Sequence, residues 1–180
     1  MKLTGIQLKY FAYGSNLLIE KLRERVPSIK KVGTGFITRF DLQFYKRSID
    51  GSGKCTIVPT LNEQDRVYGM ITMMDEEDKP RLDRAEGFGY GYSLYSIEVN
   101  THQGMVSAFT YIAEHVDETL QPFTWYRDQV VAGAGQNNFP EGYVARLERI
   151  AAEVDPDQER DLKNRKILNK QSSDKTHDQN

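Results

Sequence analysis

The chain of 180 residues is 38% hydrophobic and 11% aromatic, which is enough for one domain with its own core and short for two. Its net charge is -2 with both signs interspersed, so charge favours neither nucleic acid nor an anionic membrane as a partner. No apolar run approaches the ~20 residues of a membrane-spanning helix, and the first residues lack the apolar core of a signal peptide. A single cysteine, Cys55, excludes an internal disulfide, and we expect a soluble cytoplasmic protein.

The first predicted unit is a strand, a tight turn and a helix. Residues 8–13 form an apolar, aromatic run that Gly14 ends, and residues 17–26 carry apolar side chains at helical spacing. Asn16 is the preferred N-cap of this helix, ahead of Ser15, because its side-chain oxygen can accept a hydrogen bond from a free N–H of the first turn.

Three further strands are predicted in the next part of the chain. Residues 36–44 alternate between apolar and polar side chains, which predicts one strand with a solvated face. The DGSG segment at residues 50–53 has the composition of a turn. Residues 55–61 form a strand that Pro59 places at an edge or a bulge, and residues 66–74 form a largely buried strand.

A short helix and a hairpin follow. Residues 75–87 carry acidic side chains early, Pro80 near the first turn and Gly87 at the end, which predicts a helix of about two turns. Residues 92–100 and 105–113 are strand candidates, and the THQG segment between them joins the two as a hairpin.

The last part of the chain is predicted to be helical and then polar. Pro122 can open a helix that the GAGQNN segment ends, and Pro140 can open a second helix whose apolar stripe extends to Val154. Residues 156–180 are polar and contain few residues that can build a core, so we expect a flexible tail that can be helical near residues 162–168.

The order of these elements defines the predicted fold class. The strands are largely antiparallel, and the helices lie between and after them, which is typical of an α+β protein. We expect residues 1–155 to form a single domain and residues 156–180 to form its tail. The pattern alone leaves the topology of the sheet open.

Three common chemical motifs are disfavoured by their spacing. The SGKC segment at residues 52–55 lacks the upstream glycine and the Ser or Thr of a phosphate loop. His102, His115 and His177 are scattered, so we expect no metal site. Ser15 has no neighbouring histidine and no nucleophile-elbow pattern, which argues against a serine hydrolase.

Two segments remain as candidate functional sites. In YGSNL, residues 13–17, the N–H groups after Gly14 lie at the start of a helix and can bind an anion or oxyanion, although a tight connection capped by Asn16 explains the pattern equally well. Glu86 ends the short helix, where the helix dipole disfavours a carboxylate. Glu86 is therefore either an exposed helix-end residue or a base whose pKa is raised in an aromatic pocket.

Together these segments resemble the gamma-glutamylcyclotransferases in order and spacing. The likeness covers residues 8–154 and is carried by FAYGSNL, DRVYGMITMM, LDRAEGFGYGY and YRDQVVAGAGQNNFPEGYVARLERI. It implies a small mixed β-barrel flanked by helices. It also implies that a small-molecule γ-glutamyl amino acid is cleaved into 5-oxoproline and a free amino acid. The substrate's own amine is the nucleophile, and no cofactor or metal is required.

The resemblance also implies roles for individual residues. Glu86 lies at the position of the family's catalytic acid/base. The YGSNL loop, residues 13–17, lies where the family holds the γ-glutamyl group through backbone atoms. Among the tyrosines after Glu86, Tyr92 is preferred to Tyr90 and Tyr95. The residues at substrate-binding positions are Tyr13, Gly14, Ser15, Asn16, Leu17, Tyr92 and Tyr126.

Three alternatives to this activity stay open at the level of the sequence. They are a cyclotransferase for γ-glutamylamines, a cyclotransferase specific for glutathione, and a module that binds γ-glutamyl compounds without turnover. The YGSN sequence favours γ-glutamyl amino acids, because relatives that act on γ-glutamylamines tend to have Tyr-Gly-Thr-Leu there. We expect no macromolecular partner other than a second copy of the chain, so the protein is a monomer or a homodimer.

Overall fold

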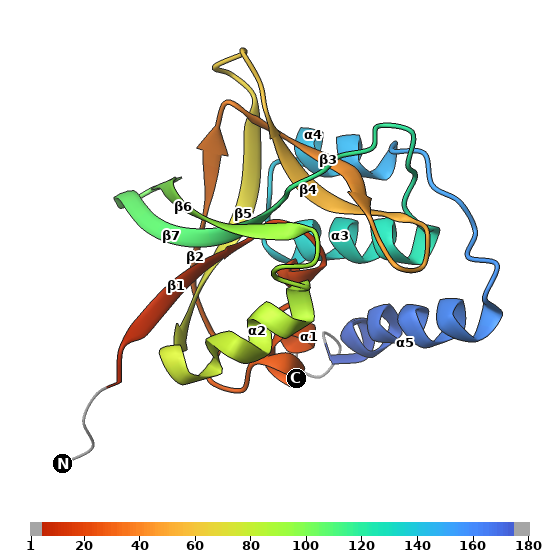
Figure 1. The fold of residues 1–180 in the computed structure, drawn as a ribbon, viewed down its shortest axis with the longest axis horizontal. Helices are drawn as coiled ribbons and strands as arrows, with labels where there is room; N and C mark the ends of the chain where they lie inside the picture. The colour runs from red at the N-terminus through yellow and green to blue at the C-terminus, as the bar shows by residue number, and fades with distance from the viewer. Residues whose placement is uncertain (1–4, 175–180) are drawn as a thin grey trace.

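The computed structural model describes residues 5–174, with side chains as far as residue 168. A closed barrel is formed by β1 (Gln7–Ala12), β2 (Lys30–Thr38), β5 (Arg66–Asp75), β6 (Tyr92–Thr101) and β7 (Gly104–Ala113). Around the barrel the order is β1-β5-β2-β6-β7 (Figure 1). Neighbouring strands are antiparallel except β1 and β7, which close the barrel in parallel where Tyr10 faces Phe109. The predicted α+β fold with a small mixed barrel is confirmed.

A separate sheet holds the next two strands, and here one prediction was wrong. β3 (Phe40–Arg47) pairs only with β4 (Gly53–Pro59), so residues 36–44 are two strands in two sheets and not one. Arg39 lies between β2 and β3 with a φ of 64°, a left-handed conformation that turns the chain out of the barrel. The apolar alternation continues on both sides of Arg39, which is why the pattern does not reveal the break. The turn predicted at residues 50–53 is confirmed.

Two short helices lie next to each other below the barrel in Figure 1. α2 (Lys79–Glu86) follows a 3-10 turn, Glu76–Asp78, and ends at Gly87, whose φ is 70°. This matches the helix predicted over residues 75–87, because glycine adopts the left-handed conformation of a helix end without strain. α1 (Ile19–Arg25) begins later than predicted, after a 3-10 turn at Ser15–Leu17.

α3 (Thr124–Gln136) packs against the 3-10 turn that precedes α1. The GAGQNN segment ends this helix as predicted, because the last helical residue, Gln136, lies within it. The close approach explains Gly133: a Cβ at this position would lie 2.5 Å from Cβ of Leu17. α4 (Glu141–Glu148) is shorter than predicted, and Val154, the expected end of its apolar stripe, is 75% exposed.

The polar C-terminal segment contains a long helix, α5 (Gln158–Asp174), which extends well beyond the predicted residues 162–168. α5 lies along α3 in Figure 1. The side-chain amide of Gln129 donates to the backbone carbonyl of Asn164 at 3.1 Å, and Arg165 donates to the hydroxyl of Thr124 at 2.6 Å. The end of the expected tail, residues 175–180, lies outside the described residues. Among the described helices, none is long and apolar enough to cross a membrane.

Candidate active site

A small cavity lies where the turn after β1 meets the C-terminal end of α2. Its volume is about 30 Å³, room for about two water molecules. Residues from β1, the following turn, β4, α2, β6, β7 and α3 contribute to its wall, so it forms only in the folded barrel. The residues that line this inner cavity are Tyr10, Tyr13, Gly14, Ser15, Asn16, Cys55, Glu86, Tyr92, Tyr111 and Tyr126.

Asn16 is the polar centre of the inner cavity. Its side-chain amide donates to the Glu86 carboxylate at 2.5 Å and to the hydroxyl of Tyr10 at 3.2 Å, and its oxygen accepts a bond from Arg25 at 3.4 Å. The predicted N-cap role of Asn16 or Ser15 is therefore wrong, because neither side chain caps the 3-10 turn or α1. The Asn16 side chain is used to fix Glu86 instead.

Glu86 is the last residue of α2 and points at the turn after β1. Burial raises the pKa of its carboxyl above the ordinary value, while the charge of Arg25 and the hydrogen bond from Asn16 act in the opposite direction. α2 itself is tied to the barrel wall because the Tyr111 hydroxyl donates to Asp83 at 2.5 Å. The sequence left two alternatives for Glu86, and the structure excludes the exposed helix-end residue.

Two tyrosines from distant elements meet at the backbone of Cys55. The Tyr92 hydroxyl donates to the Cys55 carbonyl at 2.6 Å, and the Tyr126 hydroxyl accepts from the Cys55 N–H at 3.2 Å. Tyr90 and Tyr95, the alternatives to Tyr92, are 88% and 48% exposed and do not line the cavity. Both hydroxyls therefore lie at fixed positions opposite Glu86.

The predicted binding loop is not continuous, because Gly14 lines the inner cavity and Leu17 does not. A Cβ on Gly14 would lie 3.0 Å from Cβ of Cys55 and 3.5 Å from the Tyr126 hydroxyl, so glycine is required here for close packing. Leu17 is only 1% exposed, packs in the core and is not among the residues that line the cavity. The structure thus brings together all the predicted site residues except Leu17.

Three cavity residues were missed by the sequence analysis. Tyr10 lies in the run of residues 8–13, which we assigned only to a strand, and a strand pattern does not place Tyr10 and Tyr13, three residues apart, on one face. Cys55 and Tyr111 come from β4 and β7, with no motif around them. Burial raises the pKa of the Cys55 thiol to about 12, which makes it a packing residue and not a nucleophile.

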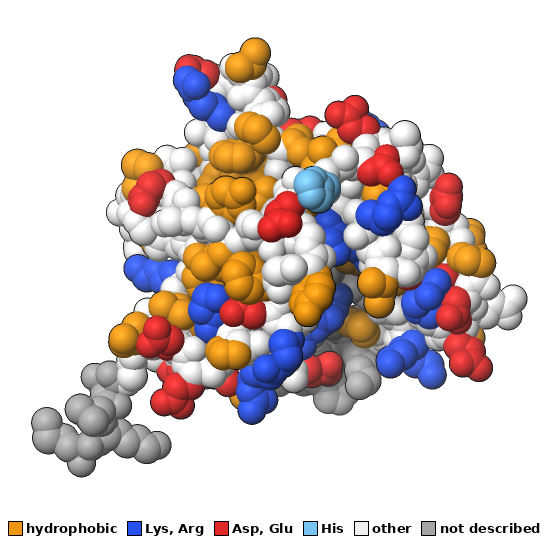
Figure 2. Space-filling view, viewed as in Figure 1, with side chains coloured by type: hydrophobic (Ala, Val, Ile, Leu, Met, Phe, Trp, Pro, Cys, Tyr) orange, Lys and Arg blue, Asp and Glu red, His pale blue; other side chains and the backbone are white. Residues whose placement is uncertain are grey.

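A larger outer cavity of about 220 Å³ adjoins the inner one and shares four of its residues, Ser15, Glu86, Tyr92 and Tyr126. Its remaining wall includes Lys21 and Arg25 from α1 and Lys46 and Lys54 from the β3–β4 sheet. In Figure 2, Lys and Arg side chains gather along the middle of the face, between the α2 side and the α5 side. No three His, Cys, Asp or Glu side chains of the described residues are grouped to hold a metal ion.

Comparison with known proteins places this geometry in a family. A model of the AIG2-like family matches residues 66–147. The mouse gamma-glutamylcyclotransferase is 30% identical over 153 residues, which cover 81% of this chain and 80% of the mouse protein. The human gamma-glutamylcyclotransferase is also 30% identical, over 78% of this chain and 77% of the human protein. A solved structure of a gamma-glutamyl cyclotransferase superposes with a TM-score of 0.76 at 27% identity, covering 82% of this chain and 90% of its own. The chain belongs to the gamma-glutamylcyclotransferase family.

Proposed function

We propose that this protein converts γ-glutamyl amino acids into 5-oxoproline and a free amino acid, with Glu86 as the general acid/base. The observation that carries the proposal is the contact of 2.5 Å between Asn16 and Glu86, which brings the only carboxylate of the inner cavity against the YGSN turn. The names of the mouse and human relatives support the same activity.

The substrate supplies its own nucleophile in this reaction. The α-amine attacks the γ-carbonyl carbon, a five-membered ring closes, and the bond to the leaving nitrogen breaks. Holding the chain folded back can contribute several kcal/mol through effective molarity. The α-ammonium must first lose one proton, which Glu86 accepts, and the same nitrogen loses a second proton to solvent as the ring amide forms. The leaving nitrogen gains one proton from the protonated Glu86 as its bond breaks and another from solvent, so it departs as an ammonium. No net proton is consumed by the enzyme.

The turn after β1 supplies donors for negative charge. The N–H groups of Leu17 and Leu18 are bonded to the carbonyls of Gly14 and Ser15, at 3.0 and 3.3 Å. The N–H groups of Ser15 and Asn16 have no acceptor among the described residues. We therefore assign these two N–H groups to the substrate's α-carboxylate or to the oxyanion formed during ring closure. One donor of this kind contributes about 3–4 kcal/mol in comparable acyl-transfer sites.

The two cavities suggest where each part of the substrate binds. The inner cavity of about 30 Å³ has room for only part of a γ-glutamyl group, so the rest of this group lies where the two cavities join, and the outer cavity of about 220 Å³ has room for an amino acid. Glu86 lines both. In this arrangement the γ-glutamyl group lies at the YGSN turn, the scissile bond lies beside Glu86, and the leaving amino acid occupies the outer cavity.

The test is a direct assay of 5-oxoproline release by the purified chain. γ-Glutamyl-alanine, γ-glutamyl-ε-lysine and glutathione are compared at equal concentrations. We expect release from γ-glutamyl-alanine. Turnover of only γ-glutamyl-ε-lysine would show that the substrates are γ-glutamylamines. Turnover of only glutathione would show a glutathione-specific enzyme. Tight binding of 5-oxoproline with no turnover of any of the three would identify a binding module and overturn the proposal.

A further inference from the structure

The outer cavity carries more positive charge than is needed to neutralise the Glu86 carboxylate. Four cationic side chains, Lys21, Arg25, Lys46 and Lys54, line it, and among the described residues Glu86 is the only carboxylate in its wall. Lys54 is already neutralised, because its ammonium lies 2.9 Å from the Asp50 carboxylate. Balancing Glu86 takes one of the other three. The wall therefore has an excess of cations over anions before any ligand enters.

The three remaining cations have neutral partners. Lys21 donates to the side-chain oxygen of Gln129 at 2.7 Å, and Arg25 donates to that of Asn16 at 3.4 Å. The ammonium of Lys46 lies 4.9 Å from the centre of the Tyr92 ring. Among the described side chains, none of the three has a carboxylate within ion-pair distance. After one of these charges balances Glu86, the other two are available to a ligand.

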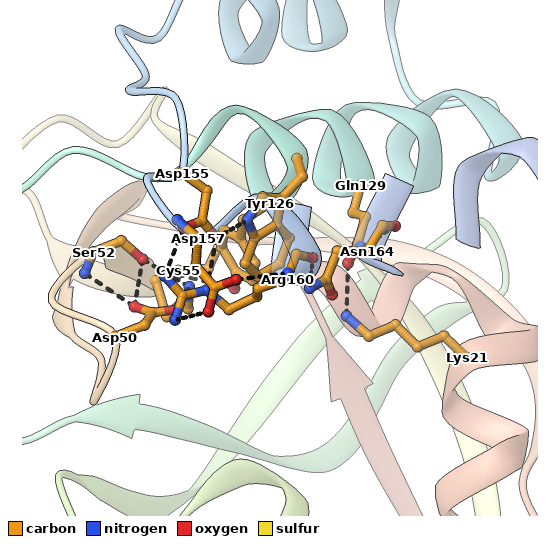
Figure 3. Close-up of polar contacts among 12 residues, drawn as sticks. Lys21, Asp50, Ser52, Cys55, Tyr126, Gln129, Asp155, Asp157, Arg160 and Asn164 are labelled. Atoms are coloured by element: carbon orange, nitrogen blue, oxygen red, sulfur yellow. Dashed lines mark hydrogen bonds and ion pairs between the residues drawn. The ribbon is translucent and has the colours of Figure 1, made fainter. Parts of the chain in front are cut away.

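Lys21 and Lys46 are positioned by their neighbours and partly removed from water, whereas Arg25 is exposed. Gln129, which fixes Lys21, is itself held by the backbone of α5 at Asn164, another residue of the cavity wall (Figure 3). Burial lowers the pKa of Lys21 to about 7 and also lowers the pKa of Lys46. A charge that is poorly solvated and already positioned gains more from an incoming anion than a mobile surface lysine does.

The position of the cavity decides which part of a substrate meets this charge. The outer cavity begins at Glu86, where the bond to the leaving amino acid breaks, so it faces the leaving group and not the γ-glutamyl group. A neutral leaving amino acid brings one carboxylate. Glutamate or aspartate brings two, which matches a wall with more than one unpaired cation.

We propose that the outer cavity selects γ-glutamyl compounds whose leaving amino acid is acidic, with Lys46 and Arg25 binding its side-chain carboxylate. This rests on the proposed cyclotransferase activity and narrows its substrate class. The same charges disfavour a cationic leaving group, such as the one in γ-glutamyl-ε-lysine.

The matched substrates for the test are γ-glutamyl-glutamate and γ-glutamyl-glutamine, which have nearly the same shape and differ in one charge. We expect kcat/KM for 5-oxoproline release to be about tenfold higher for γ-glutamyl-glutamate at low salt, equivalent to about 1.4 kcal/mol. The ratio should fall towards one as salt screens the partly exposed cations. Equal kcat/KM values at low salt would overturn the inference while leaving the cyclotransferase activity intact. No release from either compound, or from γ-glutamyl-alanine, would overturn both.

A pair of variants tests the assignment to this cavity. Lys46→Met keeps an unbranched side chain over the Tyr92 ring and removes the charge, so the preference for γ-glutamyl-glutamate should fall at least threefold. Lys31→Met makes the same change at an exposed position of β2, outside both cavities, and should keep the preference of the wild type. An undiminished preference in Lys46→Met, or an equal loss in both variants, would contradict the assignment.

Discussion

Asn16 and Glu86 are 70 positions apart in the chain, yet the Asn16 amide lies 2.5 Å from the Glu86 carboxylate. This contact joins the turn after the first barrel strand to the end of α2. It brings the carboxylate to the turn whose two N–H groups we assign to the substrate. The same amide also donates to Tyr10, so one side chain positions both Glu86 and a wall of the inner cavity.

Glu86→Gln tests the assigned base directly. Glutamine keeps the shape of the side chain and an oxygen that can accept from Asn16, but it cannot take a proton from the substrate amine. We expect 5-oxoproline release to fall by about 10²- to 10⁴-fold with the melting temperature nearly unchanged. Glu77→Gln, an exposed position in the 3-10 turn before α2, is the control. Turnover of Glu86→Gln near the wild-type rate would refute the role of Glu86.

Asn16→Ala should move the pH profile. Glu86 acts as a base only when deprotonated, so kcat/KM rises with pH through its pKa. The hydrogen bond from Asn16 lowers that pKa, and its removal should raise it. The acid limb of kcat/KM should therefore shift to higher pH in Asn16→Ala, measured as initial rates of 5-oxoproline release from pH 4 to pH 8.

The control for this profile is Asn62→Ala, which removes an exposed asparagine from a turn remote from the cavity. Its acid limb should coincide with that of the wild type. An Asn16→Ala profile that keeps the wild-type limb, even with a lower maximum, would mean that Asn16 does not act on the ionisation of Glu86.

Asp155 anchors the start of α5 and should control stability. Its side chain accepts from the Trp125 indole N–H at 2.8 Å and from Arg160 at 2.6 and 2.7 Å. The bonds from Arg160, with those from Trp125 and the backbone, lower the pKa of Asp155 to about 2. We expect Asp155→Asn to lower the free energy of unfolding at pH 7 by about 2 kcal/mol, measured by urea denaturation.

The pH dependence of this effect has a defined sign. The pKa of Asp155 is lower in the folded state than the ordinary value of about 4, so its stabilisation is present above about pH 4 and is lost as the pH falls towards 2. The difference between wild type and Asp155→Asn should shrink over that range. Asp157→Asn, whose side chain is 51% exposed and lies 3.7 Å from Arg160, is the control and should change stability by less than about 0.5 kcal/mol. An equal loss in both variants would contradict the anchoring role.

Chelation should leave the activity unchanged. The nucleophile is the substrate's own amine, and Glu86 and solvent account for the proton transfers, so the proposed reaction contains no step that needs a metal ion. We expect the same rate of 5-oxoproline release before and after dialysis against EDTA. Inhibition that added zinc reverses would require a different mechanism.

The sequence predicted best those features that depend on local chemistry. Pro80 and Gly87 mark the two ends of α2, and this places Glu86 in the last turn of the helix without any knowledge of the rest of the fold. The hairpin of β6 and β7 follows from two apolar runs joined by a short turn. Both were predicted within a few residues.

The remaining features depend on contacts between distant segments. Asn16 has the composition of an N-cap, but a carboxylate from α2 competes for its side chain, and this competition cannot be read from the residues around Asn16. Tyr111 reaches the cavity because barrel closure brings β7 beside β1, and Cys55 reaches it because β4, from the separate sheet, packs against β7. The break at Arg39 is hidden for a different reason, since both of the sheets that it connects use the same apolar alternation.

The parallel pairing of β1 with β7 has a consequence for how the protein folds during its synthesis. The ribosome makes β1 well before β7, the strand that closes the barrel and ends at Ala113, and Tyr126 follows later still. Pairings between such remote segments form slowly, because a long stretch of chain must lose conformational entropy before the new contacts stabilise it. A nascent polypeptide that contains only the turn and Glu86 therefore has no assembled pocket, and the site can form only after Tyr126 has been made.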